Sequence, residues 1–180
     1  MEKQINISLV KMTDSDLLRI APIVADAFEK AMIDALGEEK ATTYSKAFGD
    51  DAFNEFSHGD NVDSYIIVID DCESGIAILK EFAENSYSLE LFSISPQYSG
   101  GGVGNMVWSE VEKLYPNASV FETTTPTFAI KNVNFYVNKC KFHIVELLDS
   151  VKIAQETGEH NPYMDAPDFR FNFRFQKKMS

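Results

Sequence analysis

The sequence predicts an α/β fold in which a mixed, mostly antiparallel central sheet is flanked by helices. Two observations support this prediction. Three strand-like runs follow one another with only short turns between them, as antiparallel neighbours do: Ser64–Ile69, Gly75–Phe82 and Ser86–Ile94. A helical run from Val103 to Leu114 then precedes another strand-like run at Ala118–Thr124. Strand, helix and strand in sequence favour a parallel pair joined by a right-handed crossover.

The first part of the chain is predicted to be a strand followed by helices. Ile5 to Lys11 alternates in hydrophobicity as a strand does. Thr13 or Asp14 can cap the helix that follows, and Gly37 ends it. The apolar face of this helix consists of Leu17, Ile20, Val24, Ala27, Phe28 and Ala31. Glu38 to Phe56 is predicted to be a second helical region.

Two further strands are predicted near the C-terminus. Phe142 to Leu148 is strand-like, and the polar stretch from Ser150 to Pro167 is expected to be a loop. Phe169 to Phe175 alternates strictly, which predicts a half-buried strand with its four phenylalanines on one side and its polar residues on the other. If that strand lies at the sheet edge it can pair with another chain, so a homodimer is left open.

Composition limits what the protein can bind. The chain has 180 residues and is 44% hydrophobic, enough for one substantial core, so a single domain over residues 1–180 is predicted. A net charge of −12, from 16 basic and 28 acidic residues, argues against nucleic acid as the principal partner and favours cationic substrates. We find no apolar run of about 18 residues and no basic, apolar leader, so we expect no membrane span and a cytoplasmic protein.

The cysteines and histidines predict neither a disulfide framework nor a metal site. Cys72 and Cys140 are far apart in the sequence. His58, His143 and His160 are scattered, and no cluster of these residues has the spacing of metal ligands. We therefore expect chemistry that needs no metal.

The most informative stretch is a turn with four glycines between residues 96 and 105. Because glycine lacks Cβ, such a turn can expose consecutive backbone N–H groups at the positive end of the following helix, where an anionic phosphate fits. The candidate phosphate-binding residues are Ser99, Gly100, Gly101, Gly102, Val103, Gly104 and Asn105. A dinucleotide motif is excluded because Asn105 stands where its third glycine belongs, and the Gly-Lys-Ser/Thr of a P-loop is absent.

The order of strand, Pro96, glycine turn and helix resembles the acyl-CoA-binding motif of the GNAT acetyltransferase superfamily. In that family the turn reads Gln/Arg-x-x-Gly-x-Gly/Ala. Gly102 and Gly104 stand at the glycine positions, and Ser99 stands where the family has Gln or Arg. The resemblance implies that the bound phosphate belongs to acetyl-CoA.

A second segment, Asn132 to Phe142, is similar to the family's later motif, a short helix with Asn before Phe-Tyr that leads into the next strand. Ala129 stands where many members have an asparagine that contacts CoA. Asn132 or Asn134 is expected to make that contact instead. The two motifs together cover roughly residues 86 to 145, in the family's order.

The resemblance implies an N-acetyltransferase that moves the acetyl group of acetyl-CoA to a primary amine of a small molecule or protein by direct attack. The backbone at Phe92, Ser93 and Ile94 would pair with the pantetheine arm and supply the oxyanion hole. Tyr136 stands where the family often has its proton donor, and a packing role is the alternative. We select Glu90 as the general base, against the alternative of a surface carboxylate.

Two other functions stay open at this stage. A fold does not guarantee activity, so the chain can be a catalytically weak, acyl-CoA-binding sensor or regulatory module on the same fold. It can also be an interaction domain whose glycine turn is only a turn. Binding of acetyl-CoA separates the last alternative from the first two, and turnover of an amine separates enzyme from sensor.

Overall fold

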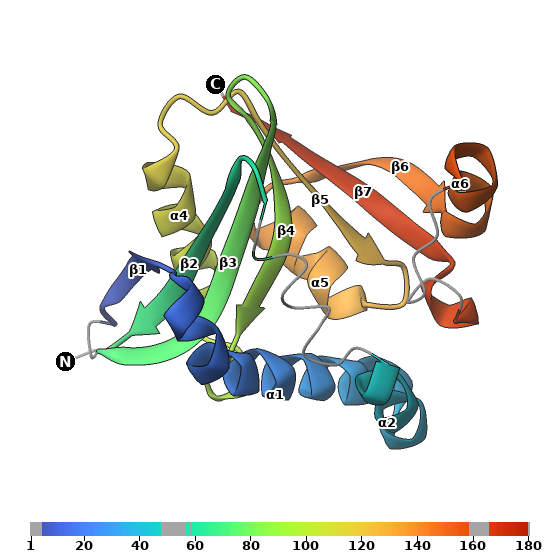
Figure 1. Cartoon of the computed structure of the whole chain (residues 1–180), viewed down its shortest axis with the longest axis horizontal. Coiled ribbons are helices and arrows are strands. Elements are labelled where there is room, and N and C mark those ends of the chain that lie inside the picture. The colour runs from blue at the N-terminus through green and yellow to red at the C-terminus, as the bar shows by residue number, and fades with distance from the viewer. Residues whose placement is uncertain (1–4, 48–56, 58, 159–165, 180) are drawn as a thin grey trace.

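The computed structural model describes residues 5–47, 57, 59–158 and 166–179. A mixed seven-stranded sheet in the order β1-β2-β3-β4-β5-β7-β6 runs through the molecule, and among the strands of these described ranges only β4 and β5 pair in parallel (Figure 1). The strands are β1 (Ile7–Lys11), β2 (Val62–Ile69), β3 (Cys72–Ala83), β4 (Ser86–Ile94), β5 (Val120–Pro126), β6 (His143–Asp149) and β7 (Phe171–Lys178). The predicted mixed, mostly antiparallel sheet with flanking helices is confirmed.

The helices lie on both sides of this sheet. They are α1 (Leu17–Leu36), α2 (Glu38–Ala47), α4 (Val103–Leu114), α5 (Ile130–Asn134) and α6 (Ser150–Thr157). A π-helical turn, Phe135–Lys139, continues α5, and the 3-10 turn Pro167–Phe169 precedes β7. No helix in the described part of the chain is long and apolar enough to cross a membrane. The second half of the predicted helical region, from residue 48 to Phe56, lies outside the described residues.

Alternate residues of the central strands pack against α1 on one face and α4 on the other. Ile66, Ile76 and Ile78 form a buried cluster with Ile20 and Val24 of α1. The opposite cluster joins α4 to the other face through Val107, Trp108, Val111, Ile67, Ala77, Leu79 and Phe121. The apolar residues of the strands, which alternate between the two faces, are therefore buried against the apolar faces of α1 and α4, as the sequence indicates.

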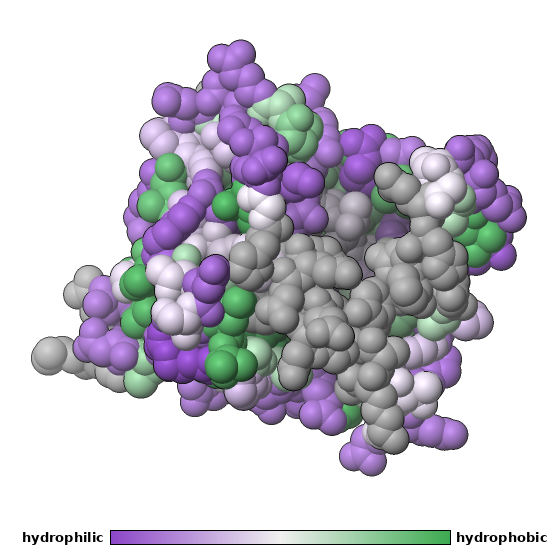
Figure 2. Space-filling view, in the orientation of Figure 1, coloured by the Kyte–Doolittle hydropathy of each residue, from purple (hydrophilic) through white to green (hydrophobic). Residues whose placement is uncertain are grey.

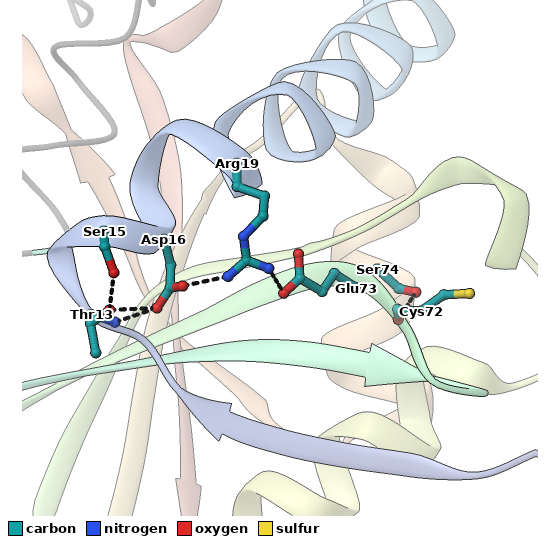
Figure 3. A network of polar contacts seen from close by, with 7 residues as sticks. All are labelled: Thr13, Ser15, Asp16, Arg19, Cys72, Glu73 and Ser74. Atoms are coloured by element: carbon teal, nitrogen blue, oxygen red, sulfur yellow. Dashed lines mark hydrogen bonds and ion pairs between the residues drawn. The ribbon is translucent and has the colours of Figure 1, made fainter.

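A polar network fastens the start of α1 to the β2–β3 hairpin (Figure 3). Arg19 forms ion pairs with Asp16, which precedes α1, and with Glu73 of β3. Asp16 also accepts hydrogen bonds from the backbone N–H and the hydroxyl of Thr13 at 2.8 and 2.7 Å. Thr13 thus caps the 3-10 turn Asp14–Asp16 that leads into α1, whereas the N-cap residue of α1 itself is Asp16 and not the predicted Thr13 or Asp14. The network fixes the direction in which α1 crosses the sheet.

The side chains of β4 do not alternate strictly along the strand. Ile78 pairs with Leu91 and Leu79 pairs with Leu89, so Glu90 is the extra residue of a β-bulge. Leu89 packs on the α4 side of the sheet, whereas Leu91 packs on the α1 side. The sequence periodicity places both leucines on one face, but the bulge inverts the alternation after Leu89.

The expected loop after Ser150 is also corrected. Residues Ser150–Thr157 form α6, because the Asp149 carboxylate accepts the N–H groups of Val151 and Lys152 at 3.1 and 3.5 Å and so caps a helix there. Residues 159–165 of the predicted loop lie outside the described part of the chain.

The last strand departs from its predicted alternation and position. Phe169 belongs to the 3-10 turn, Phe171 is 40% exposed, and Asn172 is buried and donates a hydrogen bond to the Phe169 carbonyl at 2.9 Å. β7 pairs with β5 on one side and β6 on the other, so it does not lie at the sheet edge, the position in which it would be free to pair with another chain.

Candidate functional site

The sheet opens where β4 and β5 part. These strands pair only from Ser86–Ser88 to Val120–Glu122, and their ends point away from each other (Figure 1). The Thr123 hydroxyl donates a hydrogen bond to the Leu89 carbonyl at 2.9 Å, directly beyond the last backbone pair. From there onward β4 makes no ladder with β5, so the β4 backbone can pair with an extended ligand along that side.

A cavity of about 730 Å³ begins at this opening. Its walls come from the end of β4, the glycine turn, the end of β5, α5 with the π-helical turn, and the second half of α1, which passes beneath the strand ends (Figure 1). Segments that are far apart in the sequence therefore enclose one space at the split in the sheet.

The glycine turn forms one end of the cavity. Gly100, Gly101 and Gly102 have φ of +88°, +60° and +79°, and a Cβ at any of them would meet nothing within 4 Å. In the described hydrogen-bond network, the N–H groups of residues 101–104 donate to no other backbone group. These N–H groups lie at and just before the N-terminus of α4, which is the positive end of its dipole, so this end of the cavity suits an anion.

Close packing holds the glycine turn against the π-helical turn. A Cβ at Gly104 would lie 2.9 Å from the Phe135 ring, so only glycine permits this approach. Phe135 in turn stacks on Phe92 of β4, with ring centroids 5.7 Å apart and an interplanar angle of 15°. The glycine turn, β4 and the π-helical turn are therefore fixed relative to one another.

Most of the predicted binding residues line the cavity. They are Phe92, Ile94, Ser99, Gly100, Gly101, Gly102, Gly104, Asn105, Asn132 and Asn134. Asn132 donates a weak hydrogen bond to the Thr125 hydroxyl at 3.3 Å. Two predicted residues are not in the cavity wall. Val103 packs its buried side chain in the α4 core cluster, and the Ser93 carbonyl lies against Gly75 of β3.

Tyr136 lies in the π-helical turn and lines the cavity, with 7% of its surface exposed. Burial raises the pKa of its phenol, while a hydrogen bond with Thr123 acts in the opposite direction. The phenol therefore keeps its proton at neutral pH and can donate it. Thr123 connects it to the Leu89 carbonyl at the split between the strands.

Glu90, in contrast, is not brought to the cavity wall. It is half-buried at the β4 bulge and does not belong to the lining. In the described lining Asp34 of α1 is the one acidic residue, and it pairs with Lys30 and with Lys131, the latter at 2.7 Å. The hydrogen bonds from these two lysines lower the pKa of the Asp34 carboxyl.

Sequence reasoning missed the lysines of the cavity. Lys30, Lys131 and Lys139 all line it, so three cations and one carboxylate give its described wall a positive balance within a molecule of net charge −12. No local pattern marks these residues, because α1 and α5 are about a hundred positions apart and meet only in the fold. Among the described residues, no group of three or more His, Cys, Asp or Glu is arranged to hold a metal ion.

The chain is similar to a curated protein over nearly its whole length. It is 34% identical over 185 residues to the uncharacterized protein YrkN of Bacillus subtilis strain 168, across 99% of this chain and 95% of that protein. No protein-family model matches the chain.

Solved structures of acetyltransferases share the fold at low sequence identity. The PaiA N-acetyltransferase of Thermoplasma acidophilum, in complex with coenzyme A, has a TM-score of 0.67 and 16% identity, over 97% of this chain and 99% of that one. The ribosomal-protein-S18-alanine N-acetyltransferase of Escherichia coli has a TM-score of 0.66 and 13% identity, over 98% and 95% of the two chains. An acetyltransferase of Bacillus subtilis, in complex with CoA, has a TM-score of 0.59 and 16% identity, over 98% and 100%.

Proposed function

Because the chain belongs to one family with YrkN of Bacillus subtilis and has the GNAT acetyltransferase fold, we propose that it transfers the acetyl group of acetyl-CoA to a primary amine. One observation carries this proposal. The unpaired N–H groups of the glycine turn and the Tyr136 phenol face the same cavity, at the place where β4 is free to pair with a ligand.

The glycine turn is the proposed site of the coenzyme's diphosphate. Its N–H groups and the α4 dipole attract an anion, and the open space around Gly100 to Gly102 leaves room for phosphate oxygens. Lys139 lines the same cavity and adds a positive charge. Ser99 replaces the family's usual Gln or Arg, so backbone donors carry most of the contact.

The pantetheine arm is proposed to lie along the free side of β4. Phe92 and Ile94 line the cavity there, and in the described residues the β4 backbone forms no ladder with β5 beyond the contact of the Leu89 carbonyl with Thr123. An amide of the arm can therefore pair with β4 as an additional strand would. The same backbone offers an N–H to the carbonyl oxygen of the thioester, which becomes negative as the amine attacks.

Proton transfers complete the proposed reaction. An alkylammonium with a pKa of about 10 must lose a proton before its nitrogen attacks the thioester carbonyl. Glu90 stands away from the cavity wall, so we propose that it accepts this proton through water. The C–S bond then breaks, and Tyr136 donates its proton to the departing thiolate, whose conjugate thiol has a pKa of about 8.5.

The substitution Gly102→Glu tests the placement of the coenzyme. It adds bulk and negative charge where the diphosphate is proposed to lie, so we expect binding of acetyl-CoA to fall below detection in calorimetric titration. Gly158→Glu is the matched control, because Gly158 has φ 74° and ψ 1° against 79° and 4° at Gly102 and caps α6 outside the cavity. Both variants carry the same left-handed strain of about 1–2 kcal/mol. Wild-type affinity in Gly102→Glu would disprove this placement.

A sensor without turnover is the second candidate, favoured by the absence of an unpaired carboxylate from the described cavity lining. Release of free thiol from acetyl-CoA, measured over a library of amines, separates the two functions. Turnover of any amine supports the enzyme. Tight binding without turnover across the library supports the sensor.

A further inference from the structure

We propose that the acceptor is a monoamine carried on an apolar, ring-sized body, and that this body binds among Phe28, Met32, Phe128 and Phe169, here called the aromatic end of the cavity. The inference rests on the proposed acetyl transfer and names its substrate class. Three observations lead to it: the position of these residues, their packing and the charge around them.

The aromatic end lies across the cavity from the glycine turn. β4 leads into the glycine turn, whereas β5 ends at Pro126 and leads directly to Phe128. Because the two strands diverge, the segments that follow them lie at different ends of the same space. Tyr136 lines the cavity from the π-helical turn, which continues α5, the element that follows Phe128 in the chain. A coenzyme held at the glycine turn therefore leaves the aromatic end to the other substrate.

Packing fixes the shape of this end before any ligand arrives. Phe169 and Met32 are each 4% exposed, and both belong to a buried cluster with Ala41 of α2. Phe169 meets Phe128 edge to face, with ring centroids 5.1 Å apart and an angle of 87°. Rigid aromatic walls favour a flat apolar group, because a preformed surface loses little conformational entropy on binding.

The charges around the cavity disfavour an acceptor with a second ammonium group. In the described lining, Asp34 is already neutralised by Lys30 and Lys131. A diamine would place its distal cation among these lysines without a free carboxylate to receive it. The overall charge of −12 favours cationic acceptors in general, but this local wall selects one with a single amino group.

Asp168 is proposed as a positioning residue for the aromatic end. Its carboxylate accepts a hydrogen bond from the Tyr44 hydroxyl at 2.6 Å and pairs with Lys40 at 2.9 Å, so it ties the turn that carries Phe169 to α2. Tyr44 also packs edge to face on Phe169, with centroids 5.1 Å apart. Asp168 therefore acts on the acceptor only through the placement of Phe169.

The test compares kcat/KM for phenethylamine, ethanolamine and putrescine with the full chain and saturating acetyl-CoA. We expect phenethylamine to exceed ethanolamine by at least about tenfold, since burying a phenyl ring contributes that much or more. Putrescine is expected to rank with ethanolamine or below it. In Phe128→Ala, and in the milder Phe128→Leu if the first does not fold, the ratio of phenethylamine to ethanolamine should fall severalfold. Phe82→Ala is the control, because Phe82 is 50% exposed on β3 and outside the cavity lining.

Each outcome decides the inference. The inference is supported if the protein prefers phenethylamine, if the Phe128 variant loses this preference, and if the Phe82→Ala variant keeps it. Preference for putrescine or ethanolamine overturns it and leaves the proposed acetyl transfer standing. Absence of turnover with every amine overturns both. For Asp168→Asn, we expect the KM for phenethylamine to rise severalfold while kcat changes little, and an unchanged KM would remove the positioning role.

Discussion

At the scale of single residues, Tyr136 combines a buried phenol with access to the cavity. Burial raises its pKa, so it holds a proton that a departing thiolate can take. For Tyr136→Phe we predict that kcat falls about 10²-fold while the affinity for acetyl-CoA stays nearly unchanged. Steady-state kinetics and calorimetric titration measure the two quantities.

The matched control is Tyr87→Phe. Burial also raises the pKa of Tyr87, but Tyr87 lies on β4 among Tyr115 and Phe121, outside the cavity lining. The kcat of the Tyr87→Phe variant should equal that of the unchanged protein. A similar kcat in both variants would reduce Tyr136 to a packing residue.

Single residues also show which parts of the site a sequence can reveal. The glycine turn is local: the positive φ angles of Gly100 to Gly102 are a property of the turn itself, and the glycine pattern is readable in the sequence. Lys30, Lys131 and Phe169 are different, because α1, α5 and the turn before β7 converge only through sheet order. Their role depends on tertiary contacts that no local spacing encodes.

At the scale of elements, the split between β4 and β5 depends on Thr123. Its buried hydroxyl donates to the Leu89 carbonyl at 2.9 Å where the backbone ladder has ended. For Thr123→Val we predict a loss of about 1–3 kcal/mol in the free energy of unfolding, because the buried carbonyl loses its donor. Urea denaturation measures this change.

Thr124→Val provides the comparison on the same strand. Thr124 is exposed, and valine suits a strand, so its free energy of unfolding should change by less than about 0.5 kcal/mol. Equal losses at Thr123 and Thr124 would contradict the assigned role of the Leu89 contact.

The elements themselves were predictable wherever side-chain periodicity was regular. The strands of the β2–β3–β4 meander and the α4 crossover follow from their apolar patterns and turns. The bulge at Glu90 does not follow from these patterns. It is a feature of how β4 pairs with β3, and it reverses which sheet face each side chain occupies beyond Leu89. The sequence does not predict α6, because its polar composition is typical of a loop. Asp149 can be identified as the N-cap of a helix only when it is known to end β6.

At the scale of the whole molecule, several carboxylates link stability to acid. Hydrogen bonds lower the pKa values of four carboxyl groups. The main donor is Thr13 for Asp16 and Lys131 for Asp34. It is Arg170 for Asp149 and Tyr44 for Asp168. A lowered pKa contributes stability that is present above the unfolded value of about 3.9 and is lost as pH falls through the folded value. We predict a melting temperature that drops steeply below about pH 4, measured by calorimetry.

Asp149→Asn checks the origin of that drop. It removes one titrating group together with its bond to Arg170, at 2.8 Å, but keeps an oxygen that can cap α6. The variant should be less stable than the unchanged protein at pH 7, and the difference should shrink as the pH falls to about 3. A difference independent of pH would show that the carboxylate's charge plays no part.

The distribution of charge over the whole molecule governs how an anionic coenzyme arrives. Hydrophilic residues cover much of the face in Figure 2, and the chain carries −12 overall, yet the described cavity lining is positively charged. The Debye length is about 30 Å at 0.01 M salt and about 8 Å at 0.15 M. At low salt the coenzyme therefore meets the repulsion of the entire molecule, whereas at higher salt it meets mainly the glycine turn and nearby lysines.

We predict that the association rate constant of acetyl-CoA rises severalfold between these two salt concentrations, the reverse of the behaviour of a basic protein. Stopped-flow fluorescence, with Trp108 as the native reporter in the core beside Phe92, measures it. Dephosphorylated CoA, which lacks the 3′-phosphate and so carries less negative charge, should show a smaller rise. A rate constant that falls with salt would mean that the local positive wall, and not the net charge, controls the approach of the coenzyme.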